Sequence, residues 1–233
     1  MISATSLSVK LRSSEIIDFS LGVMPENLAI DIFKYLNCKH LYDDYGMSEM
    51  GSVYLKSYIM NNNVLQDNKS HMNVYELKLD KNNPIHINNV PNYEIIVKKN
   101  KLSSYFKTGD LGHYLNKNLI ITGRKKNIIV KGGENISPKF IENILKKNLL
   151  LDNVLVFGID DEFYAQDICV CVESSENGTN IKERILNFIS ENLSKIYLPK
   201  KIMLFKAFPL LPSQKIDINK IKNMEKNNET LYE

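Results

Sequence analysis

Residues 123–138, GRKKNIIVKGGENISP, lie where the pattern of the chain changes. They bring together a glycine followed by an arginine, a lysine pair, a short apolar strand and a Gly-Gly turn. Ser137-Pro138 then supplies the residue types that begin a helix, because serine caps the first amides and proline suits the first helical position. A basic hairpin with solvated lysines is the alternative interpretation, but the length and rarity of the string favour a dedicated function.

On the carboxyl side of this stretch, helices and strands alternate. Phe140, Ile141, Ile144 and Leu145 recur at helical spacing, and the apolar runs NVLVFGI and DICVCVE are typical of buried strands. A helix over about residues 180–195, a strand KIMLF and a short helix DINKIKNM follow. The order strand, helix, strand, strand, helix, strand predicts a small α+β domain.

On the amino side, short strands separated by Asn, Asp and Pro turns run over residues 53–122. Ahead of them, PENLAIDIFKYL predicts one helix, because Pro25 suits its first position and apolar residues recur every three or four positions. A β-rich part and an α+β part are therefore expected to meet near residues 123–127.

The composition excludes several classes of protein. The chain has 233 residues, of which 43% are hydrophobic, so it can bury a core. A net charge of +3 is too small for a nucleic-acid groove, and the apolar runs are shorter than the ~20 residues of a membrane helix. Cys38, Cys169 and Cys171 form neither a disulfide framework nor a CxxC motif. Without an apolar signal core near the start, the sequence predicts a reduced, cytoplasmic protein.

Two short motifs of the β-rich part carry candidate binding residues. YGMSE, residues 45–49, offers a ring for stacking on a base, a hydroxyl for a phosphate and a carboxylate oxygen for Mg²⁺. KTGDLG, residues 107–112, places Asp110 beside a glycine, where its two oxygens can accept from vicinal ribose hydroxyls. Taken alone, each motif fits an ordinary polar turn more readily.

A third candidate is Lys215, which follows a proline-rich loop in PLLPSQKIDINKI. Its ammonium could reach a reacting phosphate and carboxylate, where charge builds up in a transition state. A single lysine on such a loop is otherwise a solvated charge.

In this order and spacing, the motifs resemble the C-terminal part of the adenylate-forming superfamily, which contains AMP-dependent synthetases and acyl-CoA ligases. YGMSE is similar to that family's YGxTE, and YFKTGDLG to its TGDL. GRKKNIIVKGGENISPKFIE is similar to GRxKDxIIxxGGENIxPxEIE, and LPSQKID to LPxxGKID. The resemblance covers about residues 16–224.

The resemblance implies an α+β fold in three parts. Residues 1–122 would be a remnant of the N-terminal AMP-binding domain, with a strand–helix element and a small distorted β-barrel. Residues 123–127 would be a hinge, and residues 128–233 the compact C-terminal domain. In this family a carboxylic acid attacks the α-phosphate of ATP, and a thiol of coenzyme A or a carrier's phosphopantetheine then takes the acyl group.

The resemblance also implies roles for residues that would hold the nucleotide. Tyr45 would stack against adenine, and Ser48 would lie near the α-phosphate. Glu49 would be catalytic and hold Mg²⁺. Asp110 would bind the ribose hydroxyls, and Arg124 would reach the ribose from the hinge side.

Four further residues are implied in the second half of the reaction cycle and in the acid-activating step. Lys126 would be the hinge about which the C-terminal domain turns. Gly132 and Gly133 would form the loop that leaves room for the pantetheine arm. Lys215 would be the catalytic lysine of adenylation.

Three departures from the family pattern bear on whether the chain is active. No string like the phosphate loop YTSGTTGxPK occurs, and Gln214 and Ala165 stand where the family has glycines. The chain alone is therefore expected to be inactive and to need a separate N-terminal half, with an acyl or peptidyl carrier protein as another expected partner. The alternative is a non-catalytic interaction module or a truncated remnant without ligase activity.

Overall fold

The structure, a computed structural model, describes most of the chain. The described residues are 9–13, 16–19, 26–36, 40–47, 51–61, 64–73, 76–98, 104–115, 118–174 and 178–227. The chain divides into two compact units. The first comprises Met1–Asn83 and Tyr93–Ile121, and the second comprises Pro84–Asn92 and Thr122–Glu233.

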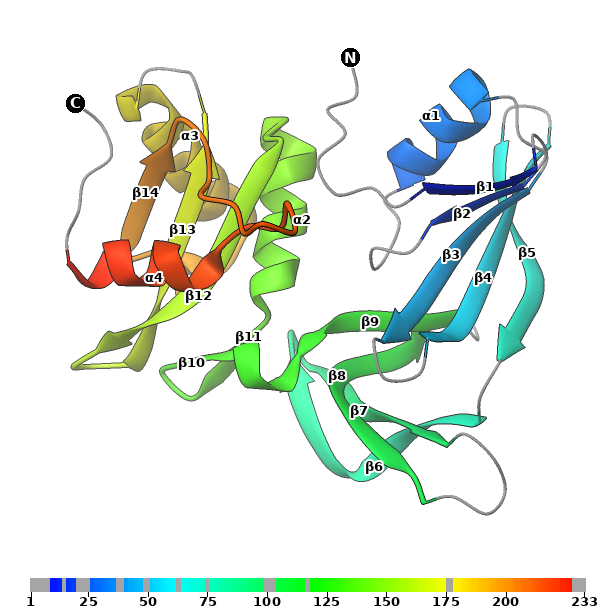
Figure 1. The fold of residues 1–233 in the computed structure, drawn as a ribbon. Helices are drawn as coiled ribbons and strands as arrows, with labels where there is room; N and C mark the ends of the chain where they lie inside the picture. The colour runs from blue at the N-terminus through cyan, green and yellow to red at the C-terminus, as the bar shows by residue number, and fades with distance from the viewer. Residues whose placement is uncertain are drawn as a thin grey trace. The chain divides into compact units, whose positions relative to one another are not determined.

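The first unit contains a five-stranded sheet in the order β1-β2-β3-β4-β5. Neighbours are antiparallel except for β2 and β3, which are parallel and joined by helix α1, as a parallel pair requires a crossover. Figure 1 shows α1 alongside this sheet, and Ala29, Ile32 and Phe33 form its buried face. The elements are β1 (Val9–Ser13), β2 (Ile16–Phe19), α1 (Glu26–Leu36), β3 (His40–Met47), β4 (Gly51–Asn61) and β5 (Val64–Asn73).

A second, four-stranded sheet follows in the order β6-β7-β8-β9, and most of its residues belong to the first unit. Its strands are β6 (Glu76–Ile87), β7 (Val90–Lys98), β8 (Phe106–Leu115) and β9 (Asn118–Arg124). Ile95, Val97 and Leu119 pack with Val53 and Leu77 in a common core. Within the described strands both sheets are open, so the predicted small β-barrel is not confirmed.

The second unit is built on a mixed sheet in the order β11-β10-β13-β12, with β14 parallel to β13 on its other flank. Two short 3-10 turns, η1 (Lys125–Asn127) and η2 (Lys195–Tyr197), accompany it. The elements are β10 (Ile129–Lys131), β11 (Glu134–Ile136), α2 (Pro138–Leu149), β12 (Asn153–Asp161), β13 (Ala165–Glu173), α3 (Gly178–Asn192), β14 (Lys201–Phe205) and α4 (Ile218–Lys226).

Helices cover both faces of this sheet. Because successive side chains of a strand point to opposite faces, Val154 and Val156 pack towards α2 and α3, whereas Leu155 and Phe157 pack towards α4. Figure 1 shows α4 crossing in front of β12–β14 and α3 behind them. The predicted α+β class is confirmed. None of the described helices is long and apolar enough to cross a membrane.

Candidate functional site

Asp110 lies at a bulge of β8 in the first unit. Thr108, Gly109 and Asp110 together oppose the single residue Ile95 of β7. Gly109 has φ +76°, a left-handed conformation that suits glycine. Thr108 Oγ1 accepts from the Asp110 amide at 3.0 Å and donates to the Ile95 carbonyl at 2.9 Å. The motif is therefore a bulge inside a strand rather than a chain-reversing turn, and bulges of this kind redirect a side chain.

The YGMSE and TGDLG motifs meet through their side chains. Tyr45 Oη donates to Asp110 Oδ2 at 2.7 Å across 65 positions of sequence. Asp110 is only 8% exposed, and Tyr45 packs against the core that contains Ile95. A buried carboxylate held by a tyrosine is a fixed hydrogen-bond acceptor of the kind that binds hydroxyl groups. Ser48 and Glu49 lie outside the described residues.

Arg124 and Lys126 lie in the second unit, where β9 ends and η1 follows. Both are exposed. Ser137 holds the backbone just before Arg124, because its Oγ donates to the Thr122 carbonyl at 2.7 Å. The same Oγ accepts from the Phe140 amide at 3.3 Å. Ser137 is thus the N-cap of α2, as its sequence position predicted.

Gly132 and Gly133 form the two-residue turn between β10 and β11. Their φ values are +56° and +85°, and turns with two positive φ angles match the twist of a hairpin and select glycine. The Gly132 amide donates to the Tyr164 carbonyl at 3.3 Å. A Cβ at Gly132 would lie 3.3 Å from the Tyr164 ring, so the missing side chain is also needed for packing.

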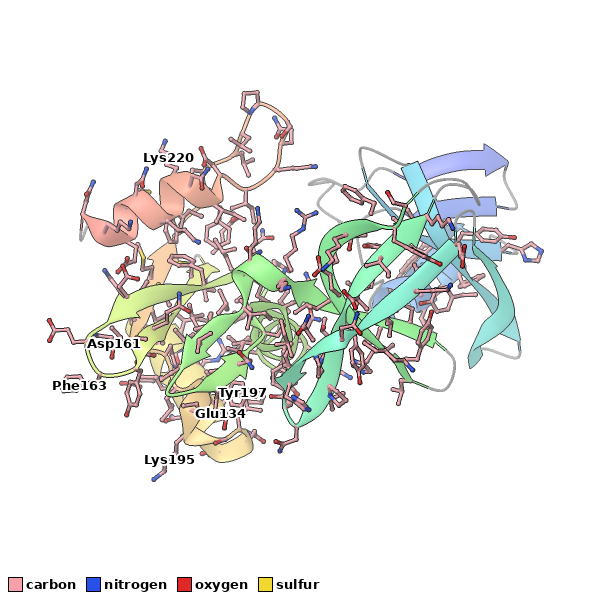
Figure 2. The ribbon with its side chains drawn as sticks, turned by 90° about the horizontal axis from the view of Figure 1, so that it is seen from below. Glu134, Asp161, Phe163, Lys195, Tyr197 and Lys220 are labelled. Atoms are coloured by element: carbon pink, nitrogen blue, oxygen red, sulfur yellow. The ribbon has the colours of Figure 1, made fainter. Side chains whose placement is uncertain are left out.

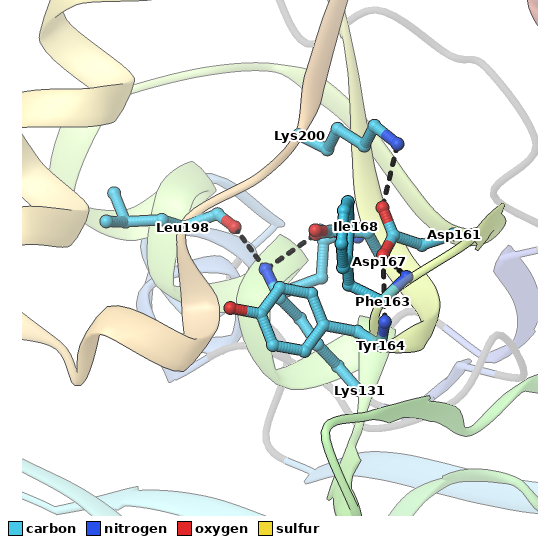
Figure 3. Close-up of polar contacts among 8 residues, drawn as sticks. All are labelled: Lys131, Asp161, Phe163, Tyr164, Asp167, Ile168, Leu198 and Lys200. Carbon is cyan, nitrogen blue, oxygen red and sulfur yellow. Dashed lines mark hydrogen bonds and ion pairs between the residues drawn. The ribbon is translucent and has the colours of Figure 1, made fainter.

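A buried lysine next to this turn was not anticipated from the sequence. Lys131 Nζ lies 2.6 Å from Asp167 Oδ1 and 2.8 Å from the Leu198 carbonyl, beneath the ring of Tyr164 (Figure 3). These contacts tie β10, β13 and the segment after η2 together beside Gly132. Lys131 lies two positions from the buried Ile129 in a strand, so period-two alternation was the available signal.

Asp161 caps the turn that carries Tyr164. Its Oδ1 accepts from the amides of Phe163 and Tyr164 at 2.9 and 2.8 Å, and its Oδ2 pairs with Lys200 Nζ at 2.7 Å (Figure 3). The Lys200 ammonium, followed by the two amides, lowers the pKa of Asp161 to about 2. Phe163 is 90% exposed and points away from the unit (Figure 2).

Lys215 is exposed at the end of a tight hairpin. The Leu211 amide donates to the Lys215 carbonyl at 2.8 Å, and the Gln214 amide donates to the Leu211 carbonyl at 2.9 Å. A turn that begins with Pro212 is followed by Gln214 at φ +62°, which is the three-residue hairpin loop with a left-handed last residue. The Lys215 ammonium makes no ion pair with any residue in the described ranges.

The predicted site residues are thus brought together only in part. Tyr45 and Asp110 are in contact in the first unit, and Arg124 and Lys126 line one pocket of the second. The glycine turn and Lys215 occupy separate loops of the second unit. Among the residues that the structure describes, no three His, Cys, Asp or Glu side chains form a metal site. The proposed Mg²⁺ ligand, Glu49, is not among those residues.

Comparisons with known proteins agree with the resemblance drawn from the motifs. The chain is 30% identical over 117 residues to the oxalate–CoA ligase of Saccharomyces cerevisiae, covering 50% of this chain and 22% of that protein. It is 32% identical over 127 residues to the 2-succinylbenzoate–CoA ligase of a Geobacillus species, covering 54% of this chain and 26% of that protein. No family model matches.

A solved structure shows the same fold. The o-succinylbenzoate CoA synthetase of Bacillus subtilis, solved in complex with its acyl-adenylate intermediate, matches 89% of this chain with a TM-score of 0.65 at 20% identity. The match covers 46% of that enzyme. The chain is therefore homologous to acyl-CoA ligases over about half its length and has the fold of part of an adenylate-forming enzyme. The matched stretch spans about a quarter of the length of the curated relatives.

Proposed function

We propose that the chain is the C-terminal portion of an AMP-forming ligase that joins a carboxylic acid to a thiol. The hydrogen bond between Tyr45 and Asp110 carries this proposal, because it places a ring and a buried carboxylate side by side. A base can stack on the ring while the ribose hydroxyls donate to the carboxylate. The homology to CoA ligases supports the same conclusion.

On this proposal the nucleotide is ATP in the first step and AMP within the acyl-adenylate. Tyr45 would bind the adenine and Asp110 the ribose. Arg124 would add a contact to the ribose, Ser48 would lie at the α-phosphate, and Glu49 would hold the Mg²⁺ that neutralises phosphate charge. The bulge at Gly109 supports this role of Asp110, since it fixes the carboxylate before any ligand binds.

The other proposed roles belong to the second unit. Lys126 would be the hinge between residues 1–122 and 128–233, in a short 3-10 turn between two better-anchored segments. Gly132 and Gly133 would face the pantetheine of coenzyme A or a carrier protein. Lys215 would stabilise the negative charge that develops between the acid and the α-phosphate, because its loop presents an ammonium without an ion-pair partner in the described residues.

The reaction also needs residues that hold the triphosphate, and the family's motif for them does not occur in this sequence. The match covers less than half of the solved relative. We therefore propose that the activity requires those residues, for instance from a separate N-terminal half. We also propose that the strands β6–β9 belong to the small β-barrel expected from the resemblance, although within the described strands their sheet is open.

A non-catalytic interaction module is the second candidate. The observation that favours it is Gln214, which holds a left-handed conformation in the loop of the proposed catalytic lysine. A strained residue at that position would be tolerated if the exact place of the ammonium no longer mattered.

Nucleotide binding separates the two candidates. We expect the 233-residue chain to bind AMP in isothermal titration calorimetry and to lose about tenfold in affinity on Asp110→Asn, because a charged acceptor for the ribose is removed. The 2′,3′-dideoxy analogue of AMP should bind the wild type more weakly than AMP does. The Asp110→Asn variant should bind AMP and the analogue with the same affinity. Asp31→Asn, at an exposed position of α1, is the matched control. Equal affinities for all these pairs would contradict the ligase proposal.

A further inference from the structure

A pocket of about 380 Å³ lies in the second unit, at the side of β12. Three segments wall it: the β9–β10 connection, the first turns of α2 and one side of α4. Its volume falls in the range of sites for small molecules and is too small for a nucleic-acid duplex. The floor is Leu155–Gly158 of β12, and a Cβ at Gly158 would lie 3.3 Å from the Ile129 side chain, another residue of the lining.

The pocket has a marked excess of positive charge. Glu142 is the acid in its lining, and this carboxylate is already engaged: Oε1 accepts from the Val156 amide at 3.0 Å, and Oε2 lies 3.8 Å from Lys139 Nζ. Lys222 Nζ lies over the Phe157 ring at 5.3 Å and has no carboxylate partner in the described ranges. The cationic side chains in the lining are Arg124, Lys126, Lys139 and Lys222.

The neighbouring pocket shares Lys222 with the first, but its lining contains two acids, Asp160 and Glu225. It has a volume of about 520 Å³ and is also rich in lysine. There, Lys200 pairs with Asp161 at 2.7 Å and Lys201 pairs with Glu225 at 2.9 Å. Two of its cations are therefore neutralised by carboxylates of the fold itself, whereas the three lysines in the lining of the first pocket, Lys126, Lys139 and Lys222, share that lining with one acid, Glu142.

We propose that the first pocket binds a small organic phosphate. Lysine and arginine hold a phosphate through charge-assisted hydrogen bonds, and four of them converge on one cavity. Ile218 lies in the same lining with 42% of its surface exposed, and it provides apolar surface for the organic part of the ligand. Lys139 and Lys222 have no role in the proposed ligase function, so variants of these two residues test phosphate binding independently of that function.

The test titrates the full chain with phenyl phosphate and with inorganic phosphate in a calorimeter. We expect phenyl phosphate to bind more tightly, because its ring also buries apolar surface. Lys139→Gln and Lys222→Gln should each weaken it about tenfold, as expected for the loss of a charged hydrogen bond. Lys220→Gln should leave it unchanged, because Lys220 is an exposed residue of α4 outside the pocket lining (Figure 2).

Three results would overturn the proposal. One is no detectable binding of phenyl phosphate to the wild type. Another is a loss of affinity in Lys220→Gln as large as in Lys222→Gln, which would indicate non-specific attraction to surface charge. The third is a loss in Asp110→Asn with none in Lys139→Gln or Lys222→Gln, which would place the probe at the proposed nucleotide site.

Discussion

Lys131 and Asp167 form an ion pair with 2.6 Å between Nζ and Oδ1, and only 7% and 8% of their side chains are exposed. Removing two charges from water is costly, so a buried pair contributes little net stability compared with apolar residues of the same shape. Each partner alone, however, would be a buried charge without an opposite charge, and would keep only a backbone hydrogen bond: Lys131 to the Leu198 carbonyl, and Asp167 from the Ile168 amide. We therefore expect the pair to contribute more to how β10, β13 and the segment at Leu198 fit together than to net stability.

A double-mutant cycle measures this arrangement. Lys131→Met should lower the free energy of unfolding by about 3–5 kcal/mol, because it leaves the Asp167 carboxylate buried and unpaired. The double variant Lys131→Met, Asp167→Leu should recover most of that loss. Denaturant titration of the single and double variants provides the values, and additive losses in the double variant would refute an energetic coupling between the two residues.

The Gln214 position makes a prediction about stability. A left-handed conformation costs a non-glycine residue roughly 1–2 kcal/mol, so replacing Gln214 by glycine relieves that strain. Part of the stabilisation is offset, because glycine gives the unfolded chain more conformational freedom. Gln214→Gly should therefore raise the free energy of unfolding by about 0.5–1 kcal/mol. Ser213→Gly, at the neighbouring position without a positive φ, should not raise it. Thermal or denaturant unfolding of both variants would show the difference.

Replacing either glycine of the KTGDLG motif by alanine should lower the stability of the protein, for a different reason at each position. A Cβ at Gly112 would lie 2.7 Å from the Ile120 carbonyl oxygen of β9, so Gly112→Ala should cost about 1–3 kcal/mol through steric overlap. A Cβ at Gly109 meets nothing within 4 Å, but its φ of +76° makes Gly109→Ala cost about 1 kcal/mol. Equal stability of Gly112→Ala and the wild type would contradict the close approach of β8 and β9.

The lowered pKa of Asp161 predicts how the free energy of unfolding changes in acid. Its folded pKa of about 2 lies below the ordinary value of 3.8, chiefly because of Lys200. The lowered pKa means that its stabilisation is complete above the unfolded value and is lost as the pH falls from ~4 towards 2. Asp161→Asn should therefore lose less stability than the wild type in this pH window. Asp160→Asn, at the exposed neighbouring position, is the control, and identical pH profiles for all three proteins would contradict the assignment.

Lys215 separates catalysis from binding in the proposed function. In a preparation that also supplies an N-terminal half, Lys215→Ala should lower adenylation by orders of magnitude with little change in ATP affinity, because the charge it contacts exists chiefly in the transition state. Pyrophosphate exchange measures the first property and calorimetry the second. Thioester formation from preformed acyl-adenylate should persist, and an active preparation whose adenylation survives Lys215→Ala would show that this lysine is not catalytic.

The sequence predicted those features that depend on local spacing. The helices α1 and α2 follow from apolar residues at helical intervals, and Ser137 caps α2 as its residue type indicates. The Asp110 bulge was predicted as a turn, because a positive φ at Gly109 satisfies both structures and only the pairing of β7 with β8 distinguishes them.

Contacts made through strand pairing could not be derived from local patterns. Lys131 and Asp167 are 36 positions apart and meet because β10 and β13 are neighbours in the sheet. The hydrogen bond from Tyr45 to Asp110 likewise depends on a tertiary fold that brings β3 and β8 together. The motifs indicated both residues of that pair but not their direct contact.

The contact between Glu142 and the Val156 amide has a consequence for self-association. In the described sheet β12 is an edge strand, and the amides of an edge are open to pairing with a strand of another molecule. Glu142 Oε1 already occupies the Val156 amide at 3.0 Å, so an incoming strand would find that donor taken. Burial raises the pKa of Glu142, yet a carboxyl that gains a proton still has an acceptor oxygen for this amide. The Val156 amide therefore keeps an acceptor within the fold whether the Glu142 carboxyl is ionised or protonated, which leaves one donor fewer for an incoming strand.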